Sequence, residues 1–453
     1  MLKRASLWLL LLIALGSPFA SAGKSTRRSA KRTESTPGPG SRAAQAPVAG
    51  HIAYIGDDAN VYICEGSCDR PTCITCAAKA EQALGEGLTN VALAGGAAQS
   101  AAQYNWPTFA PDGSQVAYSS KQRAGGSSAY GIHAYNLARR AAVTIFQSPD
   151  QPIYLSWLPG GHQLFFLVSD GETLKLMLAE AREGRPVRVI LTGLPLFFDW
   201  NQALAELAFH YVPAQGSGPE QIGLMSVTDH DQRVVKVIAK GAAPFRNPAW
   251  SPDKSHLAYV VDKHNGQVAL VIANGDGSSS REMVGLAPRD TSFTWTPDSK
   301  RLAFSTQRSE GSMSYDGVNL LDVASGNIST LVSDPVIAYN FSPDGRWLAY
   351  IGLTEQANTW NVIELGGKSR KLGNFVATHT ESVAYRYFDQ YALSHRIWSP
   401  DSRALVFAGT MLKEGMALPS GATPPPSIWL MPVDGGPAQT LADGEVAFWS
   451  PVP

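Results

Sequence analysis

Short runs of alternating apolar and polar residues recur along the chain, and each follows the same turn-forming phrase. Four of these runs lie at 115–118, 257–260, 301–304 and 347–350. The alternation of apolar and polar residues within each run is typical of half-buried β-strands. The phrase before them is an aromatic residue, one further residue and Pro-Asp, and it reads Trp-Ser-Pro-Asp at 250–253. The pattern therefore predicts a chain built from strands that begin at a repeated turn.

The phrase recurs at a nearly regular interval. Full copies lie at 109–112, 250–253, 295–298, 341–344 and 398–401, and weaker copies lie at 157–159, 200–202 and 449–451. Successive copies are 43 to 57 residues apart. Units of about 40–50 residues with four short strands indicate a β-propeller. We predict an all-β fold, a single eight-bladed propeller of four-stranded antiparallel blades. Seven blades is the alternative, if the unit around Trp200 is an insertion.

The residues of the phrase suit a tight turn between two strands. Proline presets the backbone of the first central position, and aspartate tolerates the second while its side chain bonds back to the backbone. We predict that the motif aspartates form turns, with calcium binding as the alternative. The aromatic residue is tryptophan in six of eight copies and is predicted to wedge between neighbouring blades.

The two ends of the repeat region complement each other. Residues 51–55 and 60–63 resemble the second and third strands of a blade, without a phrase before them. Residues 445–449 resemble an innermost strand. Together these segments make one blade, so we expect the N-terminal and C-terminal strands to pair and close the ring. Closure would leave no bare sheet edge.

Strings such as Trp-Ser-Pro-Asp followed by Leu-Ala-Tyr resemble the repeats of TolB-type propellers, which also occur in the dipeptidyl-peptidase family. The resemblance spans residues 51–453 and implies an exported propeller that serves as a protein-interaction platform. It does not extend to TolB itself, because residues 51–100 are assigned to a blade where that protein has an α/β domain. The sequence contains no Gly-x-Ser-x-Gly elbow, so peptidase activity is not implied.

The first residues have the features of an export signal. Lys3 and Arg4 precede an apolar run over 5–15, and 20–22 is a small-x-small cleavage site. The run is too short to span a bilayer. The predicted division of the chain is signal peptide 1–22, flexible basic linker 23–50 and β-propeller 51–453. The protein is expected to be periplasmic or secreted, and the linker is a spacer or a tether to anionic lipid or wall polymer.

Charge narrows the range of partners. The 453 residues include 37 basic and 38 acidic ones, for a net charge of −1. A dedicated nucleic-acid binder is strongly basic, so we expect no nucleic-acid partner. We also expect no membrane span and a monomer.

Four cysteines, Cys64, Cys68, Cys73 and Cys76, lie within thirteen residues after a predicted strand. In an oxidising compartment such a cluster forms disulfides, and the nested pairing of Cys64 with Cys76 and Cys68 with Cys73 is favoured. A zinc site made by all four thiolates is one alternative. A redox-active Cys73-x-x-Cys76 pair is another.

Two long segments outside the repeat, 374–395 and 409–426, are expected on the face opposite the Pro-Asp turns. Tyrosine and arginine are favoured interface residues, and loops on a rigid scaffold carry function. The candidate binding residues are His379, Glu381, Tyr385, Arg386, Tyr387, Asp389, Tyr391 and His395. The alternative is that this segment folds down as a plug over the central channel.

These features predict an exported, non-catalytic scaffold that binds a protein, a peptide or an envelope polymer through the face carrying both segments. No catalytic residue, metal or cofactor is assigned. The alternative is a hydrolase or lyase that acts on peptide or glycan in the channel, which would require two carboxylates or a His-acid pair to converge there.

Overall fold

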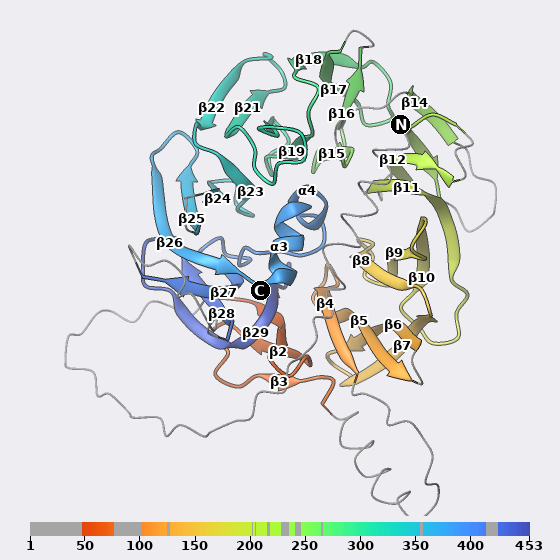
Figure 1. Ribbon diagram of the computed structural model, residues 1–453, viewed down its shortest axis with the longest axis vertical. Helices are drawn as coiled ribbons and strands as arrows, with labels where there is room; N and C mark the ends of the chain where they lie inside the picture. Colours follow the sequence, from red (N-terminus) through yellow and green to blue (C-terminus); the bar gives the residue numbers. More distant parts are fainter. Residues whose placement is uncertain are drawn as a thin grey trace, which may run out of the picture.

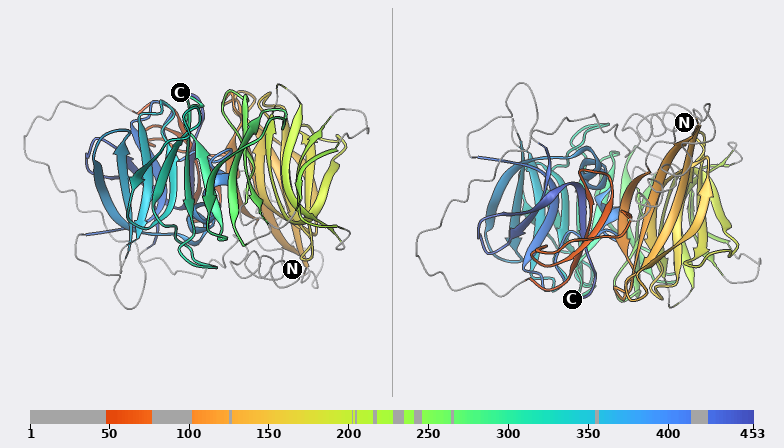
Figure 2. Two further views of the ribbon diagram at one scale, coloured as in Figure 1. Left: turned by 90° about the horizontal axis from the view of Figure 1, so that it is seen from above. Right: turned by 90° about the horizontal axis from the view of Figure 1, so that it is seen from below.

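The computed structural model describes residues 48–76, 102–124, 127–201, 203, 205–214, 218–227, 235–240, 246–263, 266–353, 357–413 and 425–453. Regular structure in these residues is almost entirely antiparallel β-sheet. Figure 1 shows the sheets side by side around a common centre, and Figure 2 shows that their strands run roughly along the central axis. This arrangement is a β-propeller, as the repeat predicted.

Three sheets contain four strands each and follow the chain in order. They consist of β4 (Gln103–Phe109), β5 (Gln115–Ala124), β6 (Ser127–Asn136) and β7 (Ala141–Ser148); β15 (Ala249–Trp250), β16 (His256–Asp262), β17 (Val268–Asn274) and β18 (Arg281–Leu286); and β19 (Thr291–Trp295), β20 (Arg301–Thr306), β21 (Val318–Asp322) and β22 (Ile328–Val332). In each sheet the strand that ends in the motif aromatic is the first.

A seven-stranded sheet joins two repeat units through one long strand. It consists of β8 (Gln151–Trp157), β9 (Gln163–Ser169), β10 (Leu174–Glu180), β11 (Arg188–Asn201), β12 (Glu206–Pro213), β13 (Gln221–Ser226) and β14 (Val235–Lys240). The first half of β11 pairs with β10 and its second half, which carries Trp200, pairs with β12. The unit around Trp200 therefore has its own four paired strands.

A ten-stranded sheet joins the two ends of the described chain. Its strands are β23 (Val336–Phe341), β24 (Trp347–Leu353), β25 (Asn358–Glu364), β26 (Ser369–Ala377), β27 (Ala404–Leu412), β28 (Ser427–Pro432), β29 (Gln439–Trp449), β1 (His51–Gly56), β2 (Val61–Glu65) and β3 (Thr72–Cys73). Strand β1 pairs antiparallel with β29, with Ile52 opposite Trp449. The expected pairing of the N-terminal and C-terminal strands is thus confirmed.

The motif aromatics connect neighbouring units. Six of the eight are buried, and Trp200 and Phe341 are half-buried. Three indole N–H groups donate to a backbone carbonyl of the preceding unit: Trp157 to Thr108 at 3.0 Å, Trp295 to Ala249 at 3.0 Å and Trp398 to Asn340 at 3.1 Å. Each acceptor directly precedes the aromatic of the preceding phrase, so the wedge is both apolar and directional.

The motif aspartates organise their own turns. Asp253 accepts bonds from the Ser251 hydroxyl at 2.6 Å and from the Ser255 backbone N–H at 3.0 Å. Partial burial acts to raise the pKa of Asp253, but these bonds outweigh it and bring the pKa to about 2. Asp298 has the equivalent bonds from Thr296 and Lys300. The turn-forming role predicted for the motif is confirmed at these positions.

The four cysteines form two disulfides, Cys64–Cys68 and Cys73–Cys76. The predicted nested pairing is wrong because β3 runs antiparallel to β2 with Cys73 opposite Tyr62. The chain then continues toward the start of β2, which carries Cys76 away from Cys64. The alternative zinc site is also wrong, since all four sulfurs are bonded in pairs.

Candidate functional site in the central channel

Residues 378–395, which we term the axial insert, interrupt the innermost strand of one unit. The end of β26 pairs with the end of β27, and β27 pairs again with Trp398 nearer its own start. Between these pairings the chain forms α3 (His379–Arg386) and α4 (Phe388–Tyr391). Both helices lie at the centre of the ring of sheets in Figure 1.

Local sequence explains why a helix begins here. The side chain of Thr378 caps the helix by accepting a bond from the backbone N–H of Glu381 at 3.0 Å. Arg386 lies in the last turn, where its positive charge suits the helix dipole. Tyr385, Phe388 and Tyr391 recur at three-residue spacing, and all three are buried.

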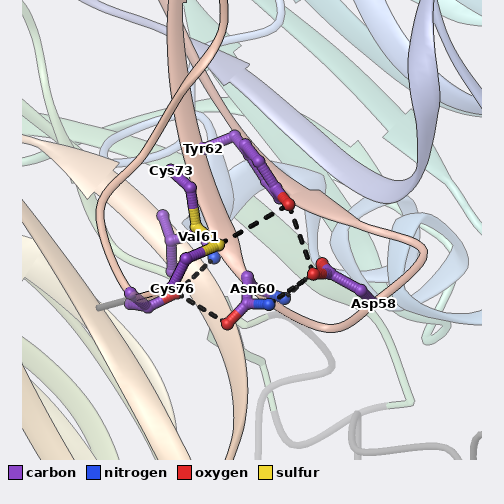
Figure 3. Close-up of a disulfide and its surroundings, with 7 residues drawn as sticks. Asp58, Asn60, Val61, Tyr62, Cys73 and Cys76 are labelled. Carbon is purple, nitrogen blue, oxygen red and sulfur yellow. Dashed lines mark hydrogen bonds between the residues drawn. A yellow bond between two sulfur atoms is a disulfide. The ribbon is translucent and has the colours of Figure 1, made fainter. Parts of the chain in front are cut away.

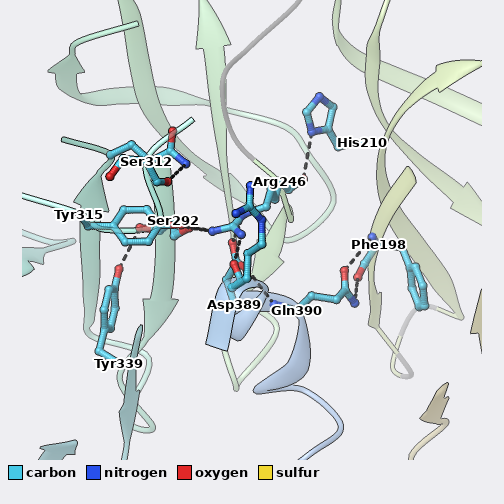
Figure 4. Close-up of polar contacts among 11 residues, drawn as sticks. Phe198, His210, Arg246, Ser292, Ser312, Tyr315, Tyr339, Asp389 and Gln390 are labelled. Carbon is cyan, nitrogen blue, oxygen red and sulfur yellow. Dashed lines mark hydrogen bonds and ion pairs between the residues drawn. The ribbon is translucent and has the colours of Figure 1, made fainter. Parts of the chain in front are cut away.

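Hydrogen bonds fix the insert to the sheets on one side of the channel. The side-chain amide of Gln390 donates to the carbonyl of Phe198 in β11 at 3.1 Å and accepts from its N–H at 3.5 Å (Figure 4). The Tyr391 hydroxyl donates to the carbonyl of Ile153 in β8 at 3.1 Å, and the Tyr154 hydroxyl donates to the carbonyl of Gln390 at 3.1 Å. These bonds hold α4 against two neighbouring units.

A buried ion pair fixes the insert on the other side. Arg246 lies 3.5 Å from the Asp389 carboxylate, and the two side chains are 3% and 4% exposed. The guanidinium also donates to the Ser292 and Tyr315 hydroxyls (Figure 4) and, in addition, to the carbonyl of Arg386. Burial acts to lower the pKa of Arg246, but Asp389 and the tyrosine hydroxyls raise it above its ordinary value. The guanidinium is therefore a permanent charge within the core.

Glu381 is a buried carboxyl at the start of the insert. Its Oε1 accepts a bond from the backbone N–H of Ala408 in β27 at 2.9 Å. Burial raises the pKa of Glu381 to about 8, although the hydrogen bonds to its carboxyl lower it in part. The side chain is therefore mostly protonated at pH 7 and serves as a neutral hydrogen-bonding group.

His395 occupies an aromatic pocket at the end of the insert. Its ring centroid lies 4.7 Å from that of Phe448, 5.0 Å from Tyr391 and 5.8 Å from Trp106. Burial lowers the pKa of His395 to about 3, so the imidazole is neutral near pH 7. Trp106 reaches this pocket from a bulge in β4, where its φ is +53°. A neutral ring in a packed pocket is suited to structure rather than to proton transfer.

The predicted binding residues thus lie mainly inside the molecule. Six have buried side chains: Glu381, Tyr385, Tyr387, Asp389, Tyr391 and His395. Arg386 is half-buried and His379 is exposed. This placement agrees with the alternative prediction of a plug over the channel. The second predicted segment is described only in part. Residues 409–412 form the end of β27, and residues 414–424 lie outside the described residues.

Sequence reasoning missed several residues that hold the insert. Arg246, Gln390 and Tyr154 belong to no recurring phrase, and their roles depend on contacts across 140 to 240 residues of sequence. Trp106 lies three residues before the motif aromatic Phe109 and is itself outside the recurring phrase. A signal was available only for Gln390, which lies within the predicted segment.

Within the insert His379 and Leu393 are exposed, and Arg386 is half-buried. We term His379, Arg386 and Met313 the rim, because the Arg386 guanidinium contacts the sulfur of Met313. Met313 is 43% exposed in the loop between β20 and β21. Across the described ranges, no group of three or more His, Cys, Asp or Glu side chains could hold a metal ion. No helix there is long and apolar enough to cross a membrane.

Comparison with solved structures supports the fold. The dihydro-heme d1 dehydrogenase NirN is 12% identical with a TM-score of 0.53, covering 91% of this chain and 78% of that chain. A prolyl endopeptidase is 12% identical with a TM-score of 0.52, covering 76% and 50% respectively. TolB from Acinetobacter baumannii is 15% identical with a TM-score of 0.39, covering 75% and 84%. At these identities the first two likenesses, with TM-scores above 0.5, concern the fold alone.

Comparison of sequences adds little. No protein-family model matches the chain. An uncharacterised peptidase of Bacillus subtilis, YuxL, is 26% identical over 148 residues, covering 24% of this chain. The match spans only 22% of that relative's length.

Proposed function

We propose that this protein is an exported, non-catalytic β-propeller that binds a protein, a peptide or an envelope polymer. Binding uses the loop face that carries 374–395 and 409–426. The observation that carries this proposal is the axial insert, whose buried aromatic and polar side chains fill the centre of the ring. Because the centre is packed like a protein core, we expect a partner to bind at the rim of the insert.

The proposed architecture is a closed ring of eight blades. Strand pairing supports eight four-stranded units if β11, β26 and β29 each contribute to two of them. The β29–β1 pairing supports closure. The domain division is signal peptide 1–22, linker 23–50 and propeller 51–453, of which residues 1–47 lie outside the described residues. The two disulfides support an oxidising, periplasmic or secreted location.

The rim offers the chemistry of an interaction surface. Arg386 and Met313 lie in contact and combine a cation with a polarisable apolar side chain. Arginine and methionine are both enriched at protein interfaces, and methionine adapts to varied partners. The buried ion pair and Gln390 bonds hold this rim in place, so a partner would meet a preformed surface.

Three buried groups weigh against the alternative of hydrolysis or lyase chemistry in the channel. Glu381 bonds to the Ala408 backbone, Asp389 pairs with Arg246, and His395 is enclosed by aromatic rings. Each group is committed to the core. A channel enzyme would instead need such groups to converge on an accessible substrate.

The proposal is tested by site-specific photocrosslinking in intact cells. A benzophenone amino acid replaces Arg386 or Met313, and Ile328, which is 47% exposed on β22, is the control position. We expect a discrete adduct at both rim positions and none at Ile328. The same adduct at all three positions, or none at any, would contradict the proposed face. Turnover of peptides or glycans that is lost in Glu381→Gln would favour the channel enzyme.

A further inference from the structure

The two disulfides differ in accessibility. Cys64 and Cys68 are 4% and 5% exposed and pack with Ile52 and Trp449, whereas Cys73 and Cys76 are half-buried. Figure 3 shows the second pair beside Tyr62 and Asp58. We propose that Cys73–Cys76 is a thiol–disulfide exchange site that accepts two electrons from a dithiol, whereas Cys64–Cys68 is structural. This inference is independent of the binding face proposed above.

The backbone between the two exchange cysteines is held without help from the disulfide. The N–H of Ile74 donates to the carbonyl of Val61 at 2.9 Å, and the N–H of Val61 donates to the Thr75 hydroxyl at 3.0 Å. That hydroxyl donates in turn to the Asn60 side chain at 3.1 Å. Reduction would therefore leave both sulfurs near each other and ready to be oxidised again.

A tyrosine hydroxyl lies beside one sulfur. The Tyr62 hydroxyl is 3.7 Å from the Cys76 Sγ and donates to the Asp58 carboxylate at 3.2 Å. Burial and Asp58 raise the pKa of Tyr62, so its hydroxyl keeps its proton. By rotating, this hydroxyl can donate to a thiolate at Cys76. The arrangement therefore favours Cys76 over Cys73 as the leaving sulfur.

The exchange follows in two balanced steps. A thiolate of the dithiol attacks the Cys73 Sγ, breaks the Cys73–Cys76 bond and forms a mixed disulfide, while Cys76 leaves as a thiolate beside Tyr62. The second thiolate of the dithiol then attacks the dithiol's first sulfur, which is bonded to Cys73 in the mixed disulfide. This step closes the disulfide of the dithiol and releases Cys73 as a thiolate. The dithiol becomes a disulfide, and the two cysteine thiolates take up protons.

The test uses the full chain, titrated with dithiothreitol, quenched in acid, labelled with a maleimide and mapped by peptide mass spectrometry. We expect Cys73 and Cys76 to be labelled at a dithiothreitol concentration at least about tenfold below that needed for Cys64 and Cys68. Tryptophan fluorescence should not change at that stage, and oxidised glutathione should restore the bond.

The variant Tyr62→Phe separates exchange from mere exposure. It should slow reduction of Cys73–Cys76 about tenfold, because a hydrogen bond to a charged sulfur is lost. Reduction of Cys64–Cys68 in the same sample is the matched control and should be unaffected. Equal reduction of both disulfides, loss of the native fluorescence when only Cys73–Cys76 opens, or a wild-type rate in Tyr62→Phe would each overturn the proposal.

Discussion

The ion pair between Arg246 and Asp389 makes a quantitative prediction about stability. The variant Asp389→Ala would leave the Arg246 guanidinium charged in a site where it is 3% exposed. Removing one partner of a buried ion pair reduces the free energy of unfolding by about 3–5 kcal/mol, because the remaining charge loses both its water and its counter-charge. The hydroxyls of Ser292 and Tyr315 would still accept bonds from Arg246, which places the expected loss nearer 3 kcal/mol.

The assay is equilibrium unfolding in urea, followed by tryptophan fluorescence, for the wild type, Asp389→Ala, Arg246→Met and the double variant. In the double variant the buried charge is gone, so it should recover much of the stability that Asp389→Ala loses. The Ser292 and Tyr315 hydroxyls bond to each other at 2.8 Å and so remain paired. The difference between the stability loss of the double variant and the sum of the two single losses measures the ion pair, separately from the effects of changed side-chain volume.

Asp316→Ala is the matched control. Asp316 lies 3.4 Å from Arg289, but the two side chains are 49% and 31% exposed. An exposed pair of this kind contributes about 0–1 kcal/mol. If Asp389→Ala loses no more stability than Asp316→Ala, or if the double variant is no better than Asp389→Ala, the interpretation of the insert as an electrostatic tie is wrong.

Two further predictions concern single groups. Glu381 has a folded-state pKa near 8 against an ordinary 4.5, so its contribution to stability is full below pH 4.5 and is lost as the pH rises through about 8. The variant Glu381→Gln lacks this pH-dependent loss. Between pH 5 and pH 9 the free energy of unfolding in urea should therefore fall by up to about 4 kcal/mol more in the wild type than in the variant, and parallel pH curves would contradict this. Trp157→Phe removes the buried bond to Thr108 and should reduce stability by about 1 kcal/mol or more, whereas Trp347→Phe, outside the phrase, should reduce it less; equal losses would argue against the directional wedge.

The propeller could be predicted from sequence because its signal is local and repeated. Each Pro-Asp turn and the strand after it depends on a few adjacent residues, and the bonds that the Asp253 carboxylate accepts from Ser251 and Ser255 each span two residues. The β1–β29 pairing could be predicted because each end lacked what the other supplied. Repetition allowed weak local preferences to reinforce one another.

The interior of the channel could not be predicted in the same way. Arg246 and Asp389 are 143 residues apart in sequence, and nothing adjacent to Arg246 marks it as a partner for a helix. The disulfide pairing depended on the register of β2 with β3, which a cluster of four cysteines does not encode. The tyrosines of the insert were recognised as important, but composition alone does not distinguish an aromatic interface from an aromatic core.

The axial insert fills the space at the centre of the sheets. Inner strands arranged around a wide ring leave a central space that their own side chains do not fill, and an apolar void or a water-filled channel would forfeit packing. Interrupting one inner strand delivers two short helices to that space while β27 still pairs on both sides of the interruption. Because the insert bonds to β8, β11 and β27, loosening it would loosen several units together. If the proposed partner binds Arg386, it contacts the segment that bonds to β8, β11 and β27, and binding should raise the stability of those units together.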